Sequence, residues 1–444
     1  MTLSLGLLLI SMLAFSCLAT SLFKQQDQAL AQQYIKTLKY RNLVIDLGNG
    51  VKTHAQLTLP AVGKGPFPAV LLVPGSGAQD MNETLGFVRI DNETGAIVYP
   101  PARPLFQIAE YLSERGFGVL RYDKRGVGAN HTILDTNVWG NATINDLIQD
   151  SKKALNVLIQ QPEVDPKRIS IIGHSEGTII APRVAIDNST KVKNIILMGT
   201  VAENFRDSAH RQSVSFPSEY ATQVLDENHT GLISIQQIAK DPLLRNLLVP
   251  SSVLRTNNAN VITNTLVNQF GNNTIEAGYI SIDKQLNILL MKGFENFTAF
   301  NLSKCNDLGG CPEMRKSLSS LIPTLSIIGN VSKSTGILLL NGENDSLTPV
   351  QQAFLLQQRL TEVNHPDHTL ITYPNLGHVF YPSSQWSTGI GPIQEYVLAD
   401  LYAWLEAHSG LSHSFVTTAA TISSMTANMT SLSTNTTSNP SRSK

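Results

Sequence analysis

The fold of this chain is decided by the stretch Ile169-Ser170-Ile171-Ile172-Gly173-His174-Ser175-Glu176-Gly177. Its first four residues form an apolar run typical of a buried strand, and residues 178–186 that follow it suit a helix. Between them, Ser175 has one glycine two residues before it and another two residues after it. A sharp turn that exposes a serine needs such small residues on both sides. The stretch therefore predicts a strand, a nucleophile elbow and a helix.

Two later strand ends offer an acid and a base for this serine. Residues 336–340 form an apolar run that ends in a polar turn containing Asp345, and residues 368–373 alternate like a strand before a loop containing His378. The carboxyl ends of parallel strands meet at one edge of a sheet, where sites of such proteins gather. The chain order serine, acid, histidine also fits an elbow of this kind. We therefore predict a Ser175-His378-Asp345 triad, with Glu343 as the alternative acid.

A glycine-rich turn after an earlier strand is the candidate oxyanion hole. Residues 68–73 form a continuous apolar strand, and it runs into Pro74-Gly75-Ser76-Gly77. Backbone N–H groups in such a turn point at a developing negative oxygen without obstruction by side chains. We expect the N–H groups of Ser76 and Glu176 to be the two donors, with Gly75 or Gly77 as alternatives to Ser76.

These motifs resemble those of the α/β-hydrolases, particularly serine esterases of the dienelactone-hydrolase and acyl-aminopeptidase neighbourhood. The resemblance covers about residues 42–204 and 336–408, including the loop at 121–128. It implies an α/β fold with a mostly parallel, doubly wound sheet. Between residues 205 and 333 the alternation of strands and helices stops, which predicts a largely helical lid after the sixth strand. In the loop at 121–128 we interpret Asp123 and Arg125 as structural. One departure is Pro74, which replaces a histidine and has no N–H to brace the oxyanion loop.

The chain divides into five segments. Residues 1–31 are predicted to be a signal peptide or an N-terminal anchor, residues 32–204 and 336–410 the two parts of the core, residues 205–335 the lid, and residues 411–444 a disordered tail rich in serine, threonine and asparagine. Apolar lid residues either line an acyl site or form the lid's own core, and the sequence leaves both open: Ile288, Leu289, Leu290, Met291, Phe294, Phe297 and Phe300.

Composition and cysteine usage exclude several classes of protein. The 444 residues carry a formal net charge of -1, which offers no field for nucleic acid, so we expect no nucleic-acid partner, and membrane association only if the N-terminal segment is uncleaved. Once a signal is removed, Cys305 and Cys311 remain. Two cysteines cannot fill a tetrahedral zinc site, whereas they suit one disulfide in an oxidising compartment. We expect neither a metal nor a cofactor.

Export is also favoured by many Asn-x-Ser/Thr triplets, although an asparagine-rich chain produces some by accident. These glycosylation triplets include Asn82, Asn92, Asn130, Asn141, Asn188, Asn228, Asn272, Asn296, Asn301 and Asn330.

By resemblance, we expect a serine hydrolase that cleaves small carboxylic esters through an acyl-enzyme. The predicted signal and the glycosylation triplets indicate a secreted or extracytoplasmic location. One alternative is an exopeptidase of the same fold that acts on short peptides, for which Glu203 or Glu219 would hold the substrate amine. The other alternative is a non-catalytic surface protein that retains the fold.

Overall fold

The computed structural model describes residues 38–85, 89–90, 97–99, 102–254, 256, 258–270, 278–298, 305, 311–383 and 391–411. The expected signal or anchor at residues 1–31, the tail from residue 412 onward and Phe300 lie outside the described residues.

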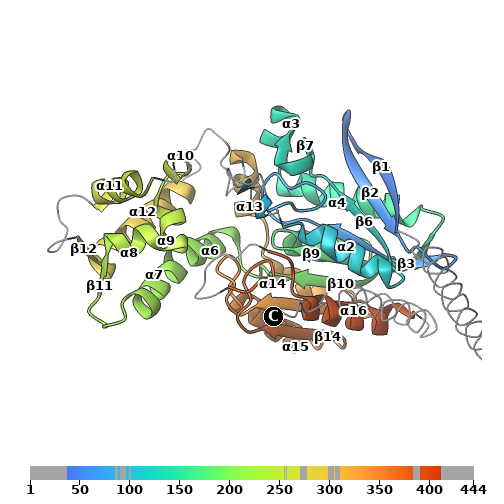
Figure 1. The fold of residues 1–444 in the computed structure, drawn as a ribbon. Helices are drawn as coiled ribbons and strands as arrows, with labels where there is room; N and C mark the ends of the chain where they lie inside the picture. Colours follow the sequence, from blue (N-terminus) through green and yellow to red (C-terminus); the bar gives the residue numbers. More distant parts are fainter. Residues whose placement is uncertain are drawn as a thin grey trace, which may run out of the picture.

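An eight-stranded sheet forms the centre of the molecule (Figure 1). In spatial order its strands are β1 (Lys39–Gly48), β2 (Val51–Leu59), β6 (Gly118–Tyr122), β3 (Phe67–Val73), β9 (Val164–His174), β10 (Val192–Met198), β13 (Gly336–Gly342) and β14 (His368–Tyr373). The pairs β1–β2 and β2–β6 are antiparallel, and every other neighbouring pair is parallel. The predicted mostly parallel sheet is therefore confirmed.

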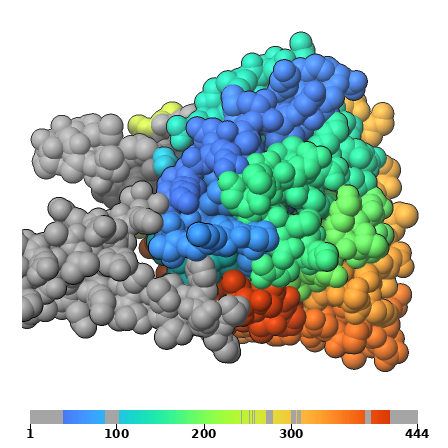
Figure 2. Space-filling view, turned by 90° about the vertical axis from the view of Figure 1, so that its right-hand side faces the viewer, coloured from blue at the N-terminus to red at the C-terminus, as the bar shows by residue number. Residues whose placement is uncertain are grey.

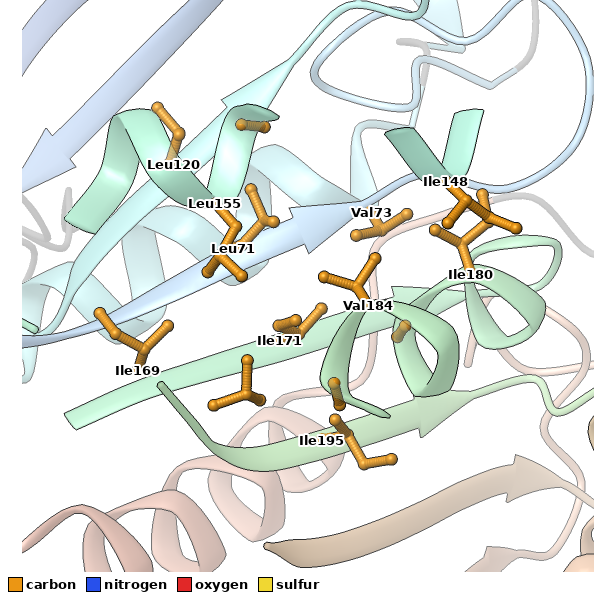
Figure 3. Packing of buried hydrophobic residues seen from close by; sticks show 14 of the residues in the cluster. Leu71, Val73, Leu120, Ile148, Leu155, Ile169, Ile171, Ile180, Val184 and Ile195 are labelled. Carbon is orange, nitrogen blue, oxygen red and sulfur yellow. The ribbon is translucent and has the colours of Figure 1, made fainter. Parts of the chain in front are cut away.

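Helices cover both faces of this sheet, as a doubly wound fold requires. One face packs against α4 (Ile144–Ile159), α5 (Gly177–Asp187) and α15 (Gln351–Glu362), and the other against α2 (Pro104–Glu114) and α16 (Glu395–Ser409). Successive strand side chains point to opposite faces, so β3 contributes Leu71 to the first core and Leu72 to the second. Figure 3 shows the first core, in which side chains of β3, β6, β9 and β10 meet those of α4 and α5. Each fully buried aliphatic side chain there contributes about 1.5–3 kcal/mol.

Several short elements lie before β9, in addition to the strands of the main sheet and the helices that cover it. They are β4 (Arg89–Ile90), β5 (Ile97–Tyr99), β7 (Val127–Gly128), β8 (Thr132–Ile133) and α3 (Thr136–Gly140). Helix α4 starts at a capping box in which Thr143 and Asp146 each satisfy the other's backbone N–H.

Between β10 and β13 the chain forms a mainly helical insertion, and β10 is the sixth strand of the main sheet along the chain. Its elements are α6 (Phe205–His210), α7 (Phe216–Tyr220), β11 (Leu232–Ser234), α8 (Ile235–Lys240), α9 (Pro242–Leu248), α10 (Ser251–Leu254), α11 (Ala259–Phe270), β12 (Tyr279–Ser281), α12 (Asn287–Thr298), α13 (Pro312–Ser320) and α14 (Thr324–Ile327). In Figure 1, α7 to α12 stand to one side of the sheet, and α13 lies near α4. We call residues 205–335 the lid.

The lid has a hydrophobic core of its own. Leu290 and Phe294 are buried in it, and Leu289, Met291 and Phe297 pack against it. Ile288, in contrast, is 63% exposed. Most of the apolar residues that the sequence left open therefore stabilise the lid.

The hairpin β1–β2 forms one edge of the sheet. In a side view of this edge, the hairpin is blue, green segments lie in the middle and the red helix α16 lies below (Figure 2). None of the helices within the described ranges combines the length and the apolar character needed to cross a membrane.

Candidate active site

The turn between β9 and α5 holds Ser175 in a left-handed conformation, with φ of 54°. A Cβ on Gly173 would lie 2.2 Å from the carbonyl oxygen of Gly177, and a Cβ on Gly177 would lie 2.3 Å from the carbonyl oxygen of Val73. Only glycine fits at either position. A positive φ at a non-glycine residue stores strain, which the close packing of β3, β9 and α5 maintains. The structure therefore contains the elbow that the sequence predicts.

Asp345 and His378 lie side by side after β13 and β14. The Nδ1 atom of His378 is 2.8 Å from Oδ2 of Asp345, and Asp345 is fully buried. The other carboxylate oxygen accepts the N–H groups of Leu347 at 2.9 Å and Thr348 at 2.8 Å. These two N–H groups hold the carboxylate in place, so that its Oδ2 orients the imidazole of His378 through Nδ1.

Glu343, the alternative acid, has a different partner. Its Oε1 accepts a hydrogen bond from the hydroxyl of Thr372 at 2.8 Å. Asp345 is therefore the carboxylate that orients His378.

His378 lies against Gly199, the residue directly after β10, close to the elbow. A Cβ on Gly199 would lie 3.1 Å from Cε1 of His378, so the glycine leaves room for the imidazole there. The neighbouring carbonyl of Met198 accepts the N–H of Ser175 at 2.9 Å. In addition, Thr348 lies 3.1 Å from Nδ1 of His378 and lines a cavity together with Ser175. The three predicted triad residues are thus gathered at one edge of the sheet.

Two side chains hold the turn after β3 by binding the N–H and the carbonyl of Gly75. Its N–H donates to Oε1 of Glu83 at 2.9 Å, and its carbonyl accepts from Nζ of Lys124. In a planar trans peptide the carbonyl and the next N–H point in opposite directions, so Lys124 also fixes the direction of the Ser76 N–H. Gly75 is excluded as the oxyanion donor because its N–H is already engaged. Within the described part of the chain, neither the N–H of Ser76 nor that of Glu176 donates to a protein acceptor.

A buried ion pair links Glu176 to Lys124, which also binds the carbonyl of Gly75 in the turn after β3. Nζ of Lys124 lies 2.7 Å from Oε1 of Glu176, and both side chains are buried. Lys124 therefore ties the turn after β3 to the residue that follows Ser175. No spacing signal in the sequence indicates this pair, because the loop after β6 brings Lys124 to the elbow only in the folded chain.

A second buried pair was also missed by sequence reasoning. Nδ1 of His174 lies 2.8 Å from Oε1 of Glu83, and Nε2 of His174 faces the carbonyl oxygen of His378 at 3.1 Å. Burial alone would lower the pKa of His174, but the charge and hydrogen bond of Glu83 outweigh burial and raise it. Through these two contacts, Glu83 and His174 together brace the oxyanion turn and the loop of His378.

Asp123 and Arg125 brace loops, in line with their structural interpretation. The carboxylate of Asp123 accepts the N–H of Met81 at 2.7 Å, and burial raises the pKa of Asp123 to about 6. The guanidinium of Arg125 makes two hydrogen bonds of 2.7 Å to Asp150 on α4.

A cavity of about 140 Å³ opens between the elbow and the lid. Ser175, Ser76 and Glu176 line it on the core side, and Phe297 is among its lid residues. Of the two carboxylates considered for amine binding, Glu203 lines the cavity, whereas Glu219 is exposed on α7.

Cys305 and Cys311 form a disulfide. Among the described residues, no group of three or more histidine, cysteine, aspartate or glutamate side chains is arranged to hold a metal ion.

Comparisons with known proteins find several to which this chain is similar. A family model described as alpha/beta hydrolase fold matches residues 68–384. Esterase EstD of Thermotoga maritima is 32% identical over 148 residues, which are 33% of this chain and 30% of the esterase. The hydrolase YtaP of Bacillus subtilis is 29% identical over 157 residues, which are 34% of this chain and 50% of YtaP. The matches thus span half or less of either relative. The crystal structure of proline iminopeptidase from Mycobacterium smegmatis aligns with 83% of this chain and 99% of its own, at 13% identity and a TM-score of 0.48.

Because the pKa of His174 is raised in the folded protein, the stability of the fold should depend on pH. A histidine whose pKa is higher in the folded state stabilises the fold fully below its unfolded pKa of about 6.5, and this contribution is lost as the pH rises through the folded pKa. Glu83→Gln keeps an acceptor oxygen but removes the charge. We expect the melting temperature of the variant to fall furthest below that of the wild type near pH 6, and the gap to narrow toward pH 9.

Thermal melts across this pH range measure the gap directly. Glu362→Gln is the matched control, since Glu362 forms an exposed ion pair with Arg359 on α15 and should give a small, flat difference. If the difference in melting temperature between Glu83→Gln and the wild type does not change with pH, Glu83 does not raise the pKa of His174.

Proposed function

Because the chain belongs to the α/β-hydrolase fold family, we propose that it is a serine hydrolase that cleaves carboxylic esters. This proposal is supported by two features at the same edge of the sheet, the strained Ser175 beside a cavity and the hydrogen-bonded Asp345–His378 pair. The similarity to an esterase over 148 residues supports the same class of reaction.

In the proposed mechanism, Nε2 of His378 takes the proton of the Ser175 hydroxyl as its oxygen attacks the ester carbonyl carbon. The carbonyl oxygen becomes an oxyanion, which the N–H groups of Ser76 and Glu176 stabilise. His378 then gives the proton to the leaving alcohol as the carbon–oxygen bond breaks. Water attacks the acyl-enzyme by the same two proton transfers and releases the acid.

The charges at the cavity favour an ester over a peptide with a free amine. Glu203 is the carboxylate placed to hold such an amine, but its oxygens accept from Arg211 at 3.1 and 3.3 Å. The side chain of Gln352 also donates to Glu203. A carboxylate already neutralised in this way binds a substrate ammonium weakly. The exopeptidase alternative therefore has less support than the esterase.

The two acidic residues after β13 separate a catalytic role from a local one. Asp345→Asn should lower kcat for short-chain p-nitrophenyl esters about 1,000-fold or more, because His378 loses the partner that orients it and stabilises its cation. Glu343→Gln should stay within about threefold of the wild type. Aminoacyl-nitroanilides, assayed in parallel, should be turned over much more slowly than the esters. The reverse ranking of the two variants would transfer the role to Glu343, and preferential anilide cleavage would favour the exopeptidase.

We also propose that the protein works outside the cytoplasm, and the acid loop offers a test. Asn344-Asp345-Ser346 is a glycosylation triplet, but Nδ2 of Asn344 donates to the carbonyl of Ser383 at 2.8 Å and Ser346 is buried. An exposed triplet, such as that of Asn228, should carry sugar in protein from its native host, whereas Asn344 should carry none. Peptide mass mapping decides this. High occupancy of Asn344 in active protein would contradict the buried acid loop, and bare asparagines throughout would contradict export.

A further inference from the structure

One cationic side chain in the cavity has no role in the mechanism above. Arg183 lies on α5, two helical turns after Ser175, and lines the same cavity as Ser175 and Ile179. Its Nη1 donates to the carbonyl of Ile179 at 2.6 Å and to the hydroxyl of Thr324 at 3.4 Å, and its Nη2 donates to the carbonyl of Ile322. All these acceptors are neutral.

Among the described residues, no carboxylate forms an ion pair with Arg183, and burial alone lowers its pKa to about 10. The other charged residues that line the cavity are compensated: Lys124 pairs with Glu176, and Glu203 pairs with Arg211. The cavity therefore holds one uncompensated positive charge. A guanidinium has five N–H donors, and the three hydrogen bonds described leave some of them for a ligand. A half-buried arginine in this state favours an anion.

The location of Arg183 also limits where the anion sits. Its bond to Ile179 directs the guanidinium back toward the start of α5, about four residues or ~6 Å along the helix from Ser175. Apolar side chains line the cavity between lid and core: Ile179, Phe205, Phe297, Met314, Leu318 and Leu321. Such a space suits a short alkyl chain with a charged end.

The cavity takes the acyl part of the substrate rather than the leaving group. Of the described residues, Ser175 and the proposed oxyanion donors Ser76 and Glu176 line it, whereas His378 does not. A leaving alcohol must lie beside His378 to receive its proton. The chain that fills the cavity is therefore attached to the carbonyl carbon.

We propose that Arg183 is a specificity residue that binds the terminal carboxylate of the acyl chain, so that the preferred substrates are monoesters of short dicarboxylic acids. This inference rests on the proposed esterase activity. Two charge-assisted hydrogen bonds from one guanidinium to a carboxylate are the strongest contact that this cavity offers.

The test compares monomethyl glutarate with methyl pentanoate, and monomethyl adipate with methyl hexanoate, by acid release. In each pair a carboxylate replaces a terminal methyl group. We expect the wild type to favour the anionic ester in kcat/KM by about tenfold or more, and Arg183→Gln to lower kcat/KM for the anionic esters by about 10- to 100-fold while changing the neutral esters less than about threefold. Arg183→Lys should fall between, because it keeps the charge without the planar fork.

Arg206→Gln is the matched control, since Arg206 is an exposed arginine of the lid on α6 and does not line the cavity. Its selectivity should equal that of the wild type. Should Arg183→Gln fail to fold, inhibition of the wild type decides: free glutarate should compete with methyl pentanoate, and butyrate should not. Equal losses for both ester classes in Arg183→Gln would show that the arginine only braces α5 against residues 322–324.

A wild type that does not distinguish the paired esters would overturn the inference while leaving the esterase intact. A preference for 4-acetoxybutanoate, which carries the carboxylate on the alcohol, would place the anion on the wrong side of the scissile bond. Absence of turnover for every ester, together with absence of labelling of Ser175 by a fluorophosphonate, would instead refute the proposed function itself.

Discussion

The architecture of the site depends on a steric constraint, the contact between three backbones at the elbow. Gly177 approaches the carbonyl of Val73, and Gly173 approaches the carbonyl of Gly177, so closely that neither position has space for a Cβ. This contact packs the start of α5 against the ends of β3 and β9. It forces Ser175 into its strained conformation, and it places the turn after β3 beside the serine. Ser175 and the turn after β3 are therefore positioned by the same backbone contact.

Two buried pairs of side chains then hold the loops that this contact brings together. Glu83 and His174 connect the oxyanion turn, the elbow and the backbone of His378, and Lys124 and Glu176 connect the oxyanion turn to the residue after Ser175. Taking one partner from such a buried pair costs about 3–5 kcal/mol, because the other charge remains buried. The network also explains how the turn keeps its shape although Pro74 has no N–H. Gly75 is held through its own N–H and carbonyl instead.

The sequence predicted the parts of the fold and the site that local patterns encode. The apolar runs at β3, β9 and β13 and the paired glycines around Ser175 have a fixed period or spacing, and Asp345 and His378 follow directly after strands. The bracing pairs have no such signal. Glu83 and His174 are 91 residues apart, and Lys124 and Glu176 are 52 apart, so only the folded sheet shows that they touch. Arg183 was missed for a related reason, since an arginine on an amphipathic helix normally faces solvent and only the lid turns its surroundings into a cavity.

The identity of the nucleophile is the claim on which the whole account depends, and covalent labelling tests it most directly. An alkyl fluorophosphonate reacts readily only with a serine that a neighbouring base activates. We predict that intact mass and peptide mapping will find one adduct per chain, on Ser175, and that Ser175→Ala protein with an unchanged melting temperature will take up no label. An adduct on another serine, or labelling that persists in the alanine variant, would contradict it.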